Sequence, residues 1–168
     1  MKKMKRLVAV LLAGVMVLAM LTACGGGSST PTSDVDKAEA LYMDAYNAAL
    51  GTDYKNDAEL KKLAKTVLDE NLNVDGTLKS DGKMTDTKSD GNSVYTVVTI
   101  LAQQGSKNVP YGITSEELAN MLANKDKVIV NVDATTKKTA TNLAVGAVKR
   151  GDNIYVAIAM TKDMNLMK

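Results

Sequence analysis

The sequence contains no histidine, no tryptophan and no phenylalanine, and its aromatic residues are six tyrosines. The absence of histidine removes the usual general base, the commonest transition-metal ligand and the side chain that titrates near neutral pH. With so few aromatic rings, the chain also lacks the side chains that stack on nucleic-acid bases. Chemistry that depends on histidine is therefore excluded, and we expect neither a metal nor another cofactor.

Cysteine and an excess of one charge are also lacking. Cys24 is the only cysteine, so no disulfide can form within the chain and no other thiol is present. Four of the 21 basic residues and none of the 19 acidic residues precede Cys24, so the remainder carries 17 basic and 19 acidic residues, a net charge of −2. Such a balance gives no electrostatic footprint for nucleic acid. We expect no nucleic-acid partner.

The N-terminus has a basic segment followed by an apolar one. Met1–Arg6 carries four positive charges, and Leu7–Leu21 carries no charge. About fifteen apolar residues are too few to span a bilayer comfortably, which favours a cleaved signal peptide. The sequence Leu-Thr-Ala-Cys that ends at Cys24 resembles the lipobox of bacterial lipoproteins. This resemblance implies cleavage between Ala23 and Cys24 and lipid attachment to the Cys24 sulfur; the alternative is an ordinary signal peptide with a chance cysteine.

Three segments follow from this reading. Residues 1–23 are predicted to be the lipoprotein signal peptide, and residues 24–33, rich in Gly, Ser and Thr, a flexible tether. Residues 34–168 are long enough for one hydrophobic core but not two. We expect a single domain, held by its lipid at the extracytoplasmic face of the cell membrane.

The first part of that domain has helical patterns. A helix is predicted from about Asp36 to a stop at Gly51. A second begins at the capping pattern Asn56–Glu59, and a third at the capping box Thr114–Glu117. The second helix carries the clearest apolar stripe of the chain, formed by Leu60, Leu63, Ala64, Val67 and Leu68.

The other segments favour loops and strands. Val74–Ser93 holds three Asp-Gly pairs and is predicted to be turn and loop, whereas Val94–Ala102 fits a strand or a short helix. Strands are predicted at Val128–Val132, Leu143–Val148 and Ile154–Met160, the last two joined by a hairpin turn at Arg150–Asn153.

The last predicted strand determines the expected architecture. Ile154–Met160 is apolar on both of its alternating faces, so helices or loops should cover both sides of the sheet. We therefore predict an α+β fold: a three-layer α/β/α sandwich with a small, mainly antiparallel sheet.

Two segments are similar to motifs of the CAP (cysteine-rich secretory, SCP-like) family. Lys88–Val98 looks like the family segment Arg-Pro-Asp-Gly-Ser-Ser-Phe-Phe-Thr-Val-Leu, and Thr141–Gly146 is similar to Thr-Glu-Ile-Gly-Val-Gly. Asn131 can stand for the Asn of the family motif His-Arg-Ala-Asn. The resemblance implies a CAP-like domain over residues 34–168 and a helix, rather than a strand, at Val94–Gln104.

The resemblance also implies a cavity with two histidines and two acidic residues, which this chain lacks. The first histidine position falls on Asp86 and the second on Val128. We therefore expect a CAP-like domain without the family's cavity residues, acting as a non-enzymatic binding or interaction module. Its expected partners are an envelope protein, a wall polymer or a small apolar ligand.

A wall-acting hydrolase is the alternative function. Its candidate residues lie in the polar segment 75–93: Ser80 and Lys83, which match a Ser-x-x-Lys pattern, and the carboxylates Asp86 and Asp90.

Two further motifs each have an ordinary explanation. Asn71–Gly76 begins like a calcium-binding loop, but Gly82 occupies the position of the bidentate Glu and the first position is Asn rather than Asp, so an ordinary Asp-Gly turn is the better explanation. Arg150–Asp152 spells an adhesion tripeptide at residues that a hairpin turn needs in any case. An exposed apolar patch at Met160–Met167 would instead indicate a spacer or assembly element.

Overall fold

The computed structural model describes residues 33–89, 91 and 93–167. The described residues belong to one compact unit. The predicted signal peptide, the lipid-attachment residue Cys24 and the tether up to residue 32 lie outside the described residues. In the part of the chain that is described, no helix is both long and apolar enough to cross a membrane.

Helix α2 (Asp34–Leu50) begins at a reciprocal cap. Ser33 Oγ accepts the backbone N–H of Asp36 at 3.1 Å, and Asp36 Oδ2 accepts the backbone N–H of Ser33 at 3.3 Å. The helix ends at Gly51, whose φ of 75° lies in the left-handed region that glycine tolerates. The predicted helix is confirmed, and it begins at Asp34 rather than Asp36.

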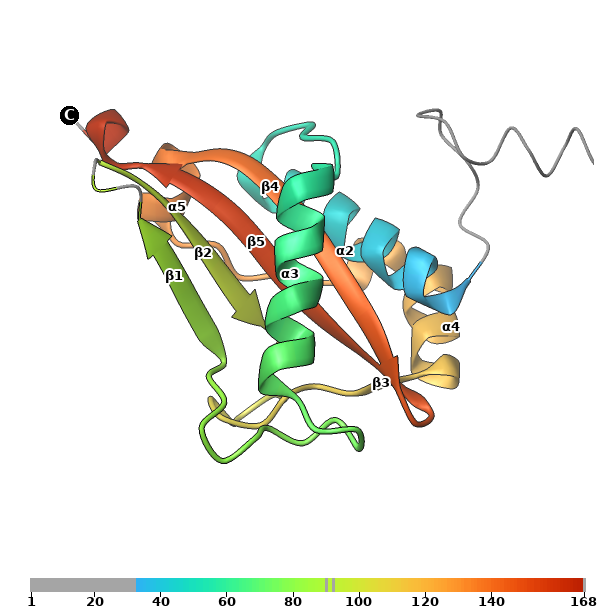
Figure 1. The fold of residues 1–168 in the computed structure, drawn as a ribbon. Helices are drawn as coiled ribbons and strands as arrows, with labels where there is room; N and C mark the ends of the chain where they lie inside the picture. Colours follow the sequence, from blue (N-terminus) through green and yellow to red (C-terminus); the bar gives the residue numbers. More distant parts are fainter. Residues whose placement is uncertain (1–32, 90, 92, 168) are drawn as a thin grey trace, which may run out of the picture. The chain divides into compact units, whose positions relative to one another are not determined.

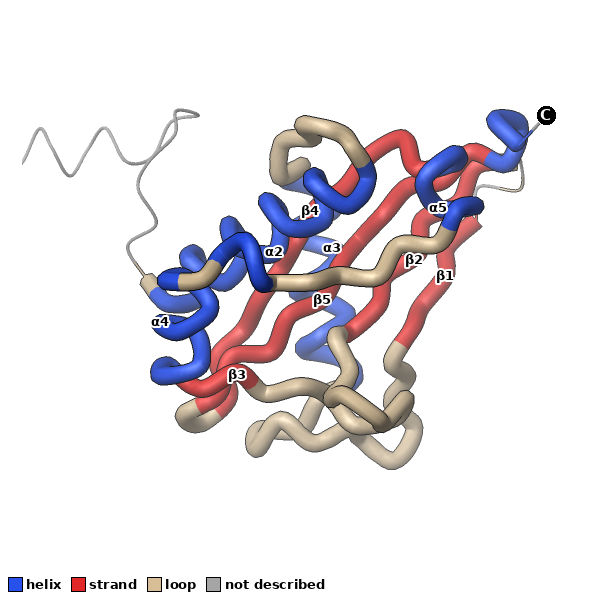
Figure 2. Tube along the Cα trace, turned by 180° about the vertical axis from the view of Figure 1, so that it is seen from behind, coloured by secondary structure: helices blue, strands red, loops and turns tan. Residues whose placement is uncertain are grey.

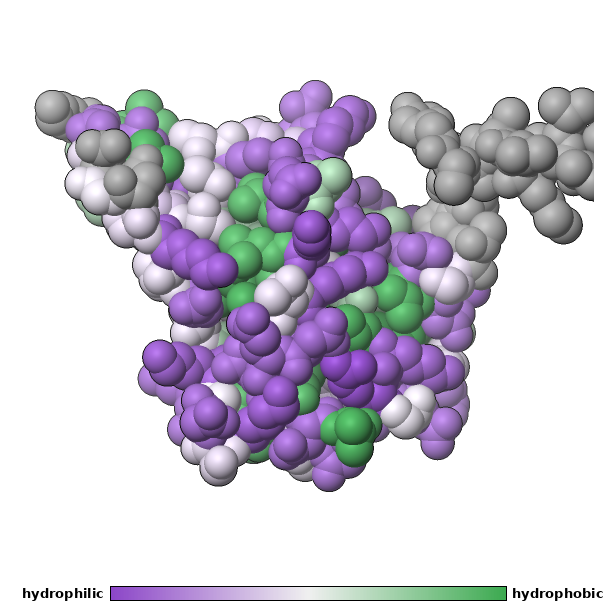
Figure 3. All heavy atoms as spheres, viewed as in Figure 1, coloured by the Kyte–Doolittle hydropathy of each residue, from purple (hydrophilic) through white to green (hydrophobic). Residues whose placement is uncertain are grey.

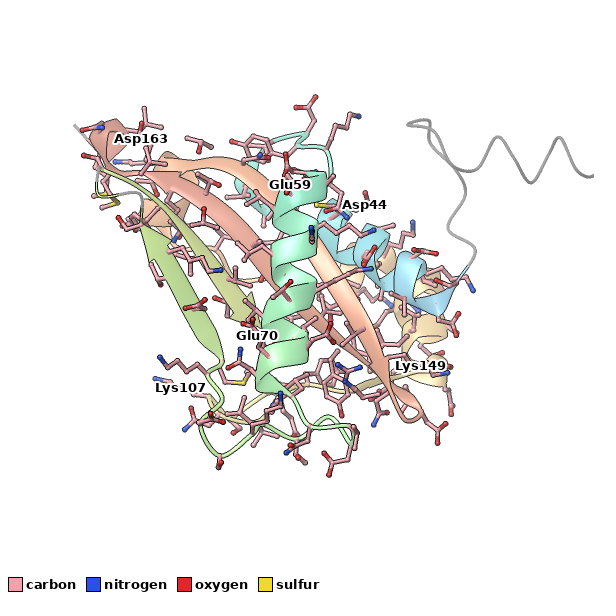
Figure 4. The ribbon with its side chains drawn as sticks, viewed as in Figure 1. Asp44, Glu59, Glu70, Lys107, Lys149 and Asp163 are labelled. Carbon is pink, nitrogen blue, oxygen red and sulfur yellow. The ribbon has the colours of Figure 1, made fainter. Side chains whose placement is uncertain are left out.

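Helix α3 (Ala58–Asn71) is capped by Asp57, whose Oδ1 accepts the backbone N–H of Leu60 at 2.9 Å. The predicted apolar stripe faces the sheet: its members Ala64, Val67 and Leu68 are buried. The exposed face is charged, and Glu59 and Glu70 lie at the two ends of the helix (Figure 4). Figure 3 shows that the α3 side of the molecule is mostly hydrophilic, with hydrophobic atoms in separate groups.

The sheet is antiparallel and centred on β5 (Asn153–Asp163). Strand β4 (Ala140–Arg150) pairs along one side of β5, whereas β2 (Val94–Ile100) and the short β3 (Ile113–Thr114) pair along the other. Strand β1 (Thr85–Ser89) pairs with β2 and forms the outer edge (Figure 1). The predicted β4–β5 hairpin is confirmed.

Helices cover both faces of this sheet, as predicted. One face of β5 packs with α2 and with α4 (Ser115–Ala123), and the short α5 (Ala134–Thr139) lies on the same side (Figure 2). The other face packs against α3. The fold is therefore α+β, with the sheet as the middle layer. Alternate β5 residues separate the two cores: Ile154, Val156, Ile158 and Met160 on the α2 side, and Tyr155, Ala157 and Ala159 on the α3 side.

Three predictions about strands and loops are wrong. The helix that the CAP resemblance implied at Val94–Gln104 is absent, because β2 pairs with two neighbouring strands. The predicted loop Val74–Ser93 contains β1, since its polar residues Thr85–Ser89 pair with β2. The predicted strand Val128–Val132 is irregular chain that crosses the α2 side of the sheet, where Val128 and Val130 pack on the core without a strand partner.

Side chains from outside the sheet hydrogen-bond the outward-facing backbone groups of β4. Asn56 makes two hydrogen bonds with Val145: its Oδ1 accepts the backbone N–H at 3.0 Å, and its Nδ2 donates to the backbone oxygen at 3.1 Å. Glu39 Oε1 accepts the backbone N–H of Ala147 at 3.0 Å. These side chains already hydrogen-bond the backbone N–H and C=O groups to which an additional strand would have to bond. The β4 edge is therefore closed to pairing with another strand.

Candidate functional site

The main candidate site is a pocket of about 190 Å³ on the α2 side of the sheet. Its floor comes from β2 and β5, and its walls come from α2, the segment 131–133 and the start of α5. Figure 2 shows this side, where the irregular chain before α5 crosses the strands. The pocket therefore forms where α2 and α5 leave part of the sheet uncovered.

One wall is polar and built from a chain of three side chains. Lys162 Nζ donates to Thr136 Oγ1 at 2.6 Å, and that hydroxyl donates to Asp133 Oδ2 at 2.9 Å. Asp133 also caps α5, because its Oδ1 accepts the backbone N–H of Thr136 at 2.8 Å. These two hydrogen bonds from Thr136 hold the pKa of Asp133 below its usual value, and the positive charge of Lys162 adds to the effect.

The opposite part of the pocket is apolar. Val97 of β2 and Ile158 and Met160 of β5 form its floor, and Tyr46 of α2 closes one side. Burial raises the pKa of the Tyr46 hydroxyl, so this tyrosine stays neutral at physiological pH. The pocket thus combines a partly apolar floor with a polar wall that carries one cationic side chain and one carboxylate.

This arrangement is suited to binding a small amphipathic molecule. The Lys162 ammonium carries three N–H donors, of which Thr136 takes one, so it can also donate to an oxygen of a ligand. Drug-sized ligands occupy pockets of roughly 300–1,000 Å³, so the ligand here is smaller. Among the residues that the structure describes, no group of three or more acidic or cysteine side chains could hold a metal ion.

A second, more open hollow of about 450 Å³ lies beside α4, between Tyr42 and Val128. Its polar groups bond to one another: Asn124 Nδ2 donates to the Asn120 backbone oxygen at 2.9 Å, and Lys127 Nζ donates to Asn124 Oδ1 at 3.3 Å. These interactions leave fewer polar groups directed at a ligand than in the first pocket.

The hydrolase candidates are not assembled into a site. Ser80 and Lys83 are exposed in the turns that follow α3, whereas Asp86 lies on β1. Between these three described residues there is no hydrogen bond or ion pair, and the Asp86 carboxylate instead accepts the backbone N–H of Thr87 at 3.0 Å. The fourth candidate, Asp90, lies outside the described residues.

The calcium-like segment is a hydrogen-bonded turn. Asp75 Oδ1 accepts both the backbone N–H and the hydroxyl of Thr77, at 3.0 and 2.7 Å. Asn71 Oδ1 accepts the backbone N–H of Lys83 at 2.7 Å. These oxygens therefore serve the local fold, in agreement with an Asp-Gly turn.

The adhesion tripeptide lies on the β4–β5 hairpin, but its arginine is already ion-paired within the domain. The Arg150 guanidinium forms an ion pair with Asp69 of α3, whereas Gly151 and Asp152 are exposed in the turn. The side chain that a receptor would have to bind is thus directed toward the domain itself.

The two histidine positions implied by the CAP resemblance lie on opposite faces of the sheet. Asp86 is paired with Val98, whose side chain packs on the α3 side, and directly paired residues share a face. Val128 packs against the core on the α2 side. The structure does not bring the two positions together, although Asn131 does line the pocket.

The C-terminal methionine-rich segment is only partly exposed. Met160 is buried, whereas Met164, Leu166 and Met167 have exposed fractions of 37%, 51% and 46%. These three residues lie in the short 3₁₀ helix η3 (Met164–Met167), and Met164 Sδ accepts a hydrogen bond from the Tyr95 hydroxyl at 3.4 Å. The exposed apolar group is thus limited to one turn.

The polar wall of the pocket was not predicted from the sequence. A usable signal was present at Lys162, which continues the alternation of Ile158 and Met160 and so places a charge on a core-facing side of β5. The sequence around Asp133 and Thr136 also has the pattern of a helix cap. Nothing in the sequence indicated that these two segments meet. No protein-family model, curated protein or solved structure matches this chain.

Proposed function

We propose that this protein is a non-enzymatic, lipid-anchored binding module at the extracytoplasmic face of the cell membrane. In this proposal Cys24 carries the lipid, the Gly/Ser/Thr-rich segment is the tether, and the compact unit holds a small amphipathic ligand. The basic and apolar N-terminus and the lipobox-like Leu-Thr-Ala-Cys support the anchor. One observation carries the binding function: the pocket lined both by the Lys162 side chain and by apolar side chains of β2 and β5.

The chemistry of the pocket indicates the kind of ligand. Ile158, Met160 and Val97 suit a short hydrocarbon body, and the Lys162 ammonium suits a carboxylate or another oxygen acceptor at one end. The hydroxyl of Thr136 already donates to Asp133 and accepts from Lys162. Thr136 therefore positions the lysine and lacks the free base that a nucleophile would need.

The hydrolase alternative has no comparable support, because Ser80 and Lys83 are exposed in the segment after α3 whereas Asp86 lies half-buried on an edge strand. The relationship to the CAP family also stays a hypothesis. Strand β2 and the separation of Asp86 from Val128 argue against it, and the proposed function does not depend on it.

The anchor is tested by replacing the lipid-attachment residue. We expect the wild-type chain to fractionate with membranes and to incorporate labelled palmitate in a producing bacterium, and Cys24→Ser to do neither. Retention of Cys24→Ser in the membrane fraction with unchanged labelling would contradict lipid attachment at this residue.

The pocket is tested by thermal unfolding with hexanoate, hexanol and hexylamine. A ligand that binds only the folded state raises the midpoint, by about 4 °C when its concentration is roughly ten times its Kd. We expect hexanoate to raise the midpoint most, and Lys162→Met to abolish that difference. Lys149→Met is the matched control, because this exposed lysine lies at the other end of the hairpin from Asp163, the neighbour of Lys162 (Figure 4). Equal responses of both variants, or no shift with any probe, would contradict the proposed ligand class.

A further inference from the structure

The two edges of the sheet differ in how far their outward-facing backbone groups are hydrogen-bonded. The edge at β4 is closed by Asn56 and Glu39, whose side chains bond to the outward-facing backbone of that strand. The edge at β1 has no such cover: in the described part of the chain, this strand pairs with β2 alone. Figures 1 and 2 show β1 at the margin of the sheet from both sides. An open edge presents unpaired backbone groups to another strand.

The hydrogen-bond pattern shows which backbone groups of β1 point outward. Just before β1, the backbone N–H of Ile100 donates to the Met84 oxygen at 2.8 Å. Because bonded and non-bonded pairs alternate along an antiparallel ladder, Asp86 and Lys88 also point their backbone groups toward β2. The backbone groups of Thr85, Thr87 and Ser89 therefore point away from β2, toward the open edge.

We propose that β1 pairs with β1 of a second copy of this chain, antiparallel and around a twofold axis at Thr87. In this register Thr87 faces Thr87, and Thr85 faces Ser89, so all the outward backbone groups form hydrogen bonds. Asp86 of each copy lies opposite Lys88 of the other, which gives two ion pairs across the axis. These are non-hydrogen-bonded pairs, in which opposing side chains are closest.

The charges select this register over its neighbours. A slip of one residue would place inward-pointing backbone groups opposite outward-pointing ones, so ladder hydrogen bonds would be lost. A slip of two residues would place Asp86 opposite Asp86 or Lys88 opposite Lys88, and like charges directly opposite each other are destabilising. Charged residues on an edge strand usually prevent association. In β1, however, the two charged residues Asp86 and Lys88 have opposite signs, so an antiparallel second copy of β1 is complementary in charge.

The pairing replaces one existing hydrogen bond. In the single chain, the backbone N–H of Thr87 donates to Asp86 Oδ1 at 3.0 Å. In the pair, that N–H donates to the Thr87 oxygen of the second copy, and the Asp86 carboxylate accepts from Lys88 instead. No residue of β1 lines the pocket, so the proposal stands apart from the proposed ligand binding.

The test uses the full chain with Thr87→Cys as a reporter. In the proposed pair the two Cα atoms at position 87 are about 5.5 Å apart, within the range that a disulfide spans. We expect oxidation to join two copies through Cys at this position. The matched control is Val74→Cys, since Val74 is 89% exposed and lies outside β1, in the turn after α3. The unaltered chain, with Cys24 alone, gives the background.

Charge variants in the Thr87→Cys background then test the register. Asp86→Lys and Lys88→Asp each place like charges opposite each other at both symmetric positions. Each should lower the cross-linked fraction on the order of tenfold. Mixing the two variants restores opposite charges in a heterodimer, and so does the double exchange in one chain. Both should recover the cross-link, and a size tag on one variant identifies the heterodimer.

Three results would overturn the proposal: cross-linking of Thr87→Cys no greater than that of Val74→Cys, equal cross-linking in the single charge variants, or no recovery in the mixture. Circular dichroism of each variant shows whether it is folded. The heterodimer recovers the cross-link only if both variants fold, so it also separates lost pairing from lost structure.

Discussion

Glu39 Oε1 on α2 lies 3.0 Å from the backbone nitrogen of Ala147 on β4 and accepts its hydrogen bond, although the two residues are far apart in sequence. Glu39 is 2% exposed, and its carboxylate also pairs with Lys61 and Lys65 of α3. One buried carboxylate thus joins both helical layers at the edge of the sheet.

Replacing this carboxylate should destabilise the domain. Glu39→Ala leaves the Ala147 N–H unpaired and two lysines without their partner, so we expect a loss of about 2 kcal/mol in the free energy of unfolding. This is below the usual cost of breaking a buried pair, because Lys61 and Lys65 are about one-third exposed. Glu39→Gln retains the acceptor and should cost less. Urea unfolding measures both, and equal stability of the two variants would contradict the role of the Ala147 hydrogen bond.

Gly76 should be intolerant of a side chain for two reasons. Its φ is +84°, and an added Cβ would lie 2.1 Å from Cζ of Tyr155. Gly105 has a similar φ of +81° but open space around it, so Gly105→Ala measures the conformational cost alone, about 1–2 kcal/mol. Gly76→Ala should cost roughly 1–3 kcal/mol more, because the Tyr155 ring must move. Equal unfolding midpoints in urea would show that Tyr155 does not restrict this position.

Gly146 allows α3 to lie close to β4. A Cβ at this position would lie 2.8 Å from the Cβ of Ala64 and 2.9 Å from the backbone oxygen of Lys61. Gly146→Ala should therefore destabilise by about 1–3 kcal/mol. Combining it with Ala64→Gly removes one of the two overlaps, so the double variant should lose less than the sum of the single losses. If the losses measured in a urea double-mutant cycle are additive, the overlap with Ala64 is not the source of the destabilisation.

Stability should fall in acid because helix-capping carboxylates are ionised in the folded state. The hydrogen bond from the backbone N–H of Leu60 lowers the pKa of Asp57 from its ordinary value of 3.8. A group whose pKa is lower in the folded state stabilises the fold above its unfolded-state pKa. That contribution is lost as the pH falls through the folded-state value, so the free energy of unfolding should decline below about pH 4.

Asp57→Asn tests this dependence, because asparagine is a comparable cap that does not titrate. Its stability at pH 7 should be close to that of the wild type, and its loss in acid should be smaller. Asp152→Asn, at the exposed hairpin turn, serves as the control. An unchanged acid profile for Asp57→Asn would show that this cap does not contribute to the pH dependence.

Local sequence signals predicted most of the helices and the hairpin. The caps at Asp57 and Thr114 bond to backbone groups only three residues away, so each helix start can be recognised from a short stretch of sequence. The alternation of Ile154–Met160 similarly indicated two covered faces. The prediction failed at Thr85–Ser89 and Val128–Val132, where the deciding factor is a strand partner elsewhere in the chain. A polar segment becomes a strand beside β2, and an apolar one without a partner does not.

The caps, the apolar faces, the turn glycines and the absence of histidine chemistry can all be derived from the amino-acid order or composition, because each depends on residues close together along the chain or on which residues are present. The pocket, the Glu39 contact with β4 and the open edge at β1 depend on residues that meet only when the chain folds. Lys162 reaches Thr136 across 26 positions, and Asn56 reaches Val145 across 89. Such contacts follow from the order of strands in the sheet, which is set by packing over the whole core rather than by any local pattern.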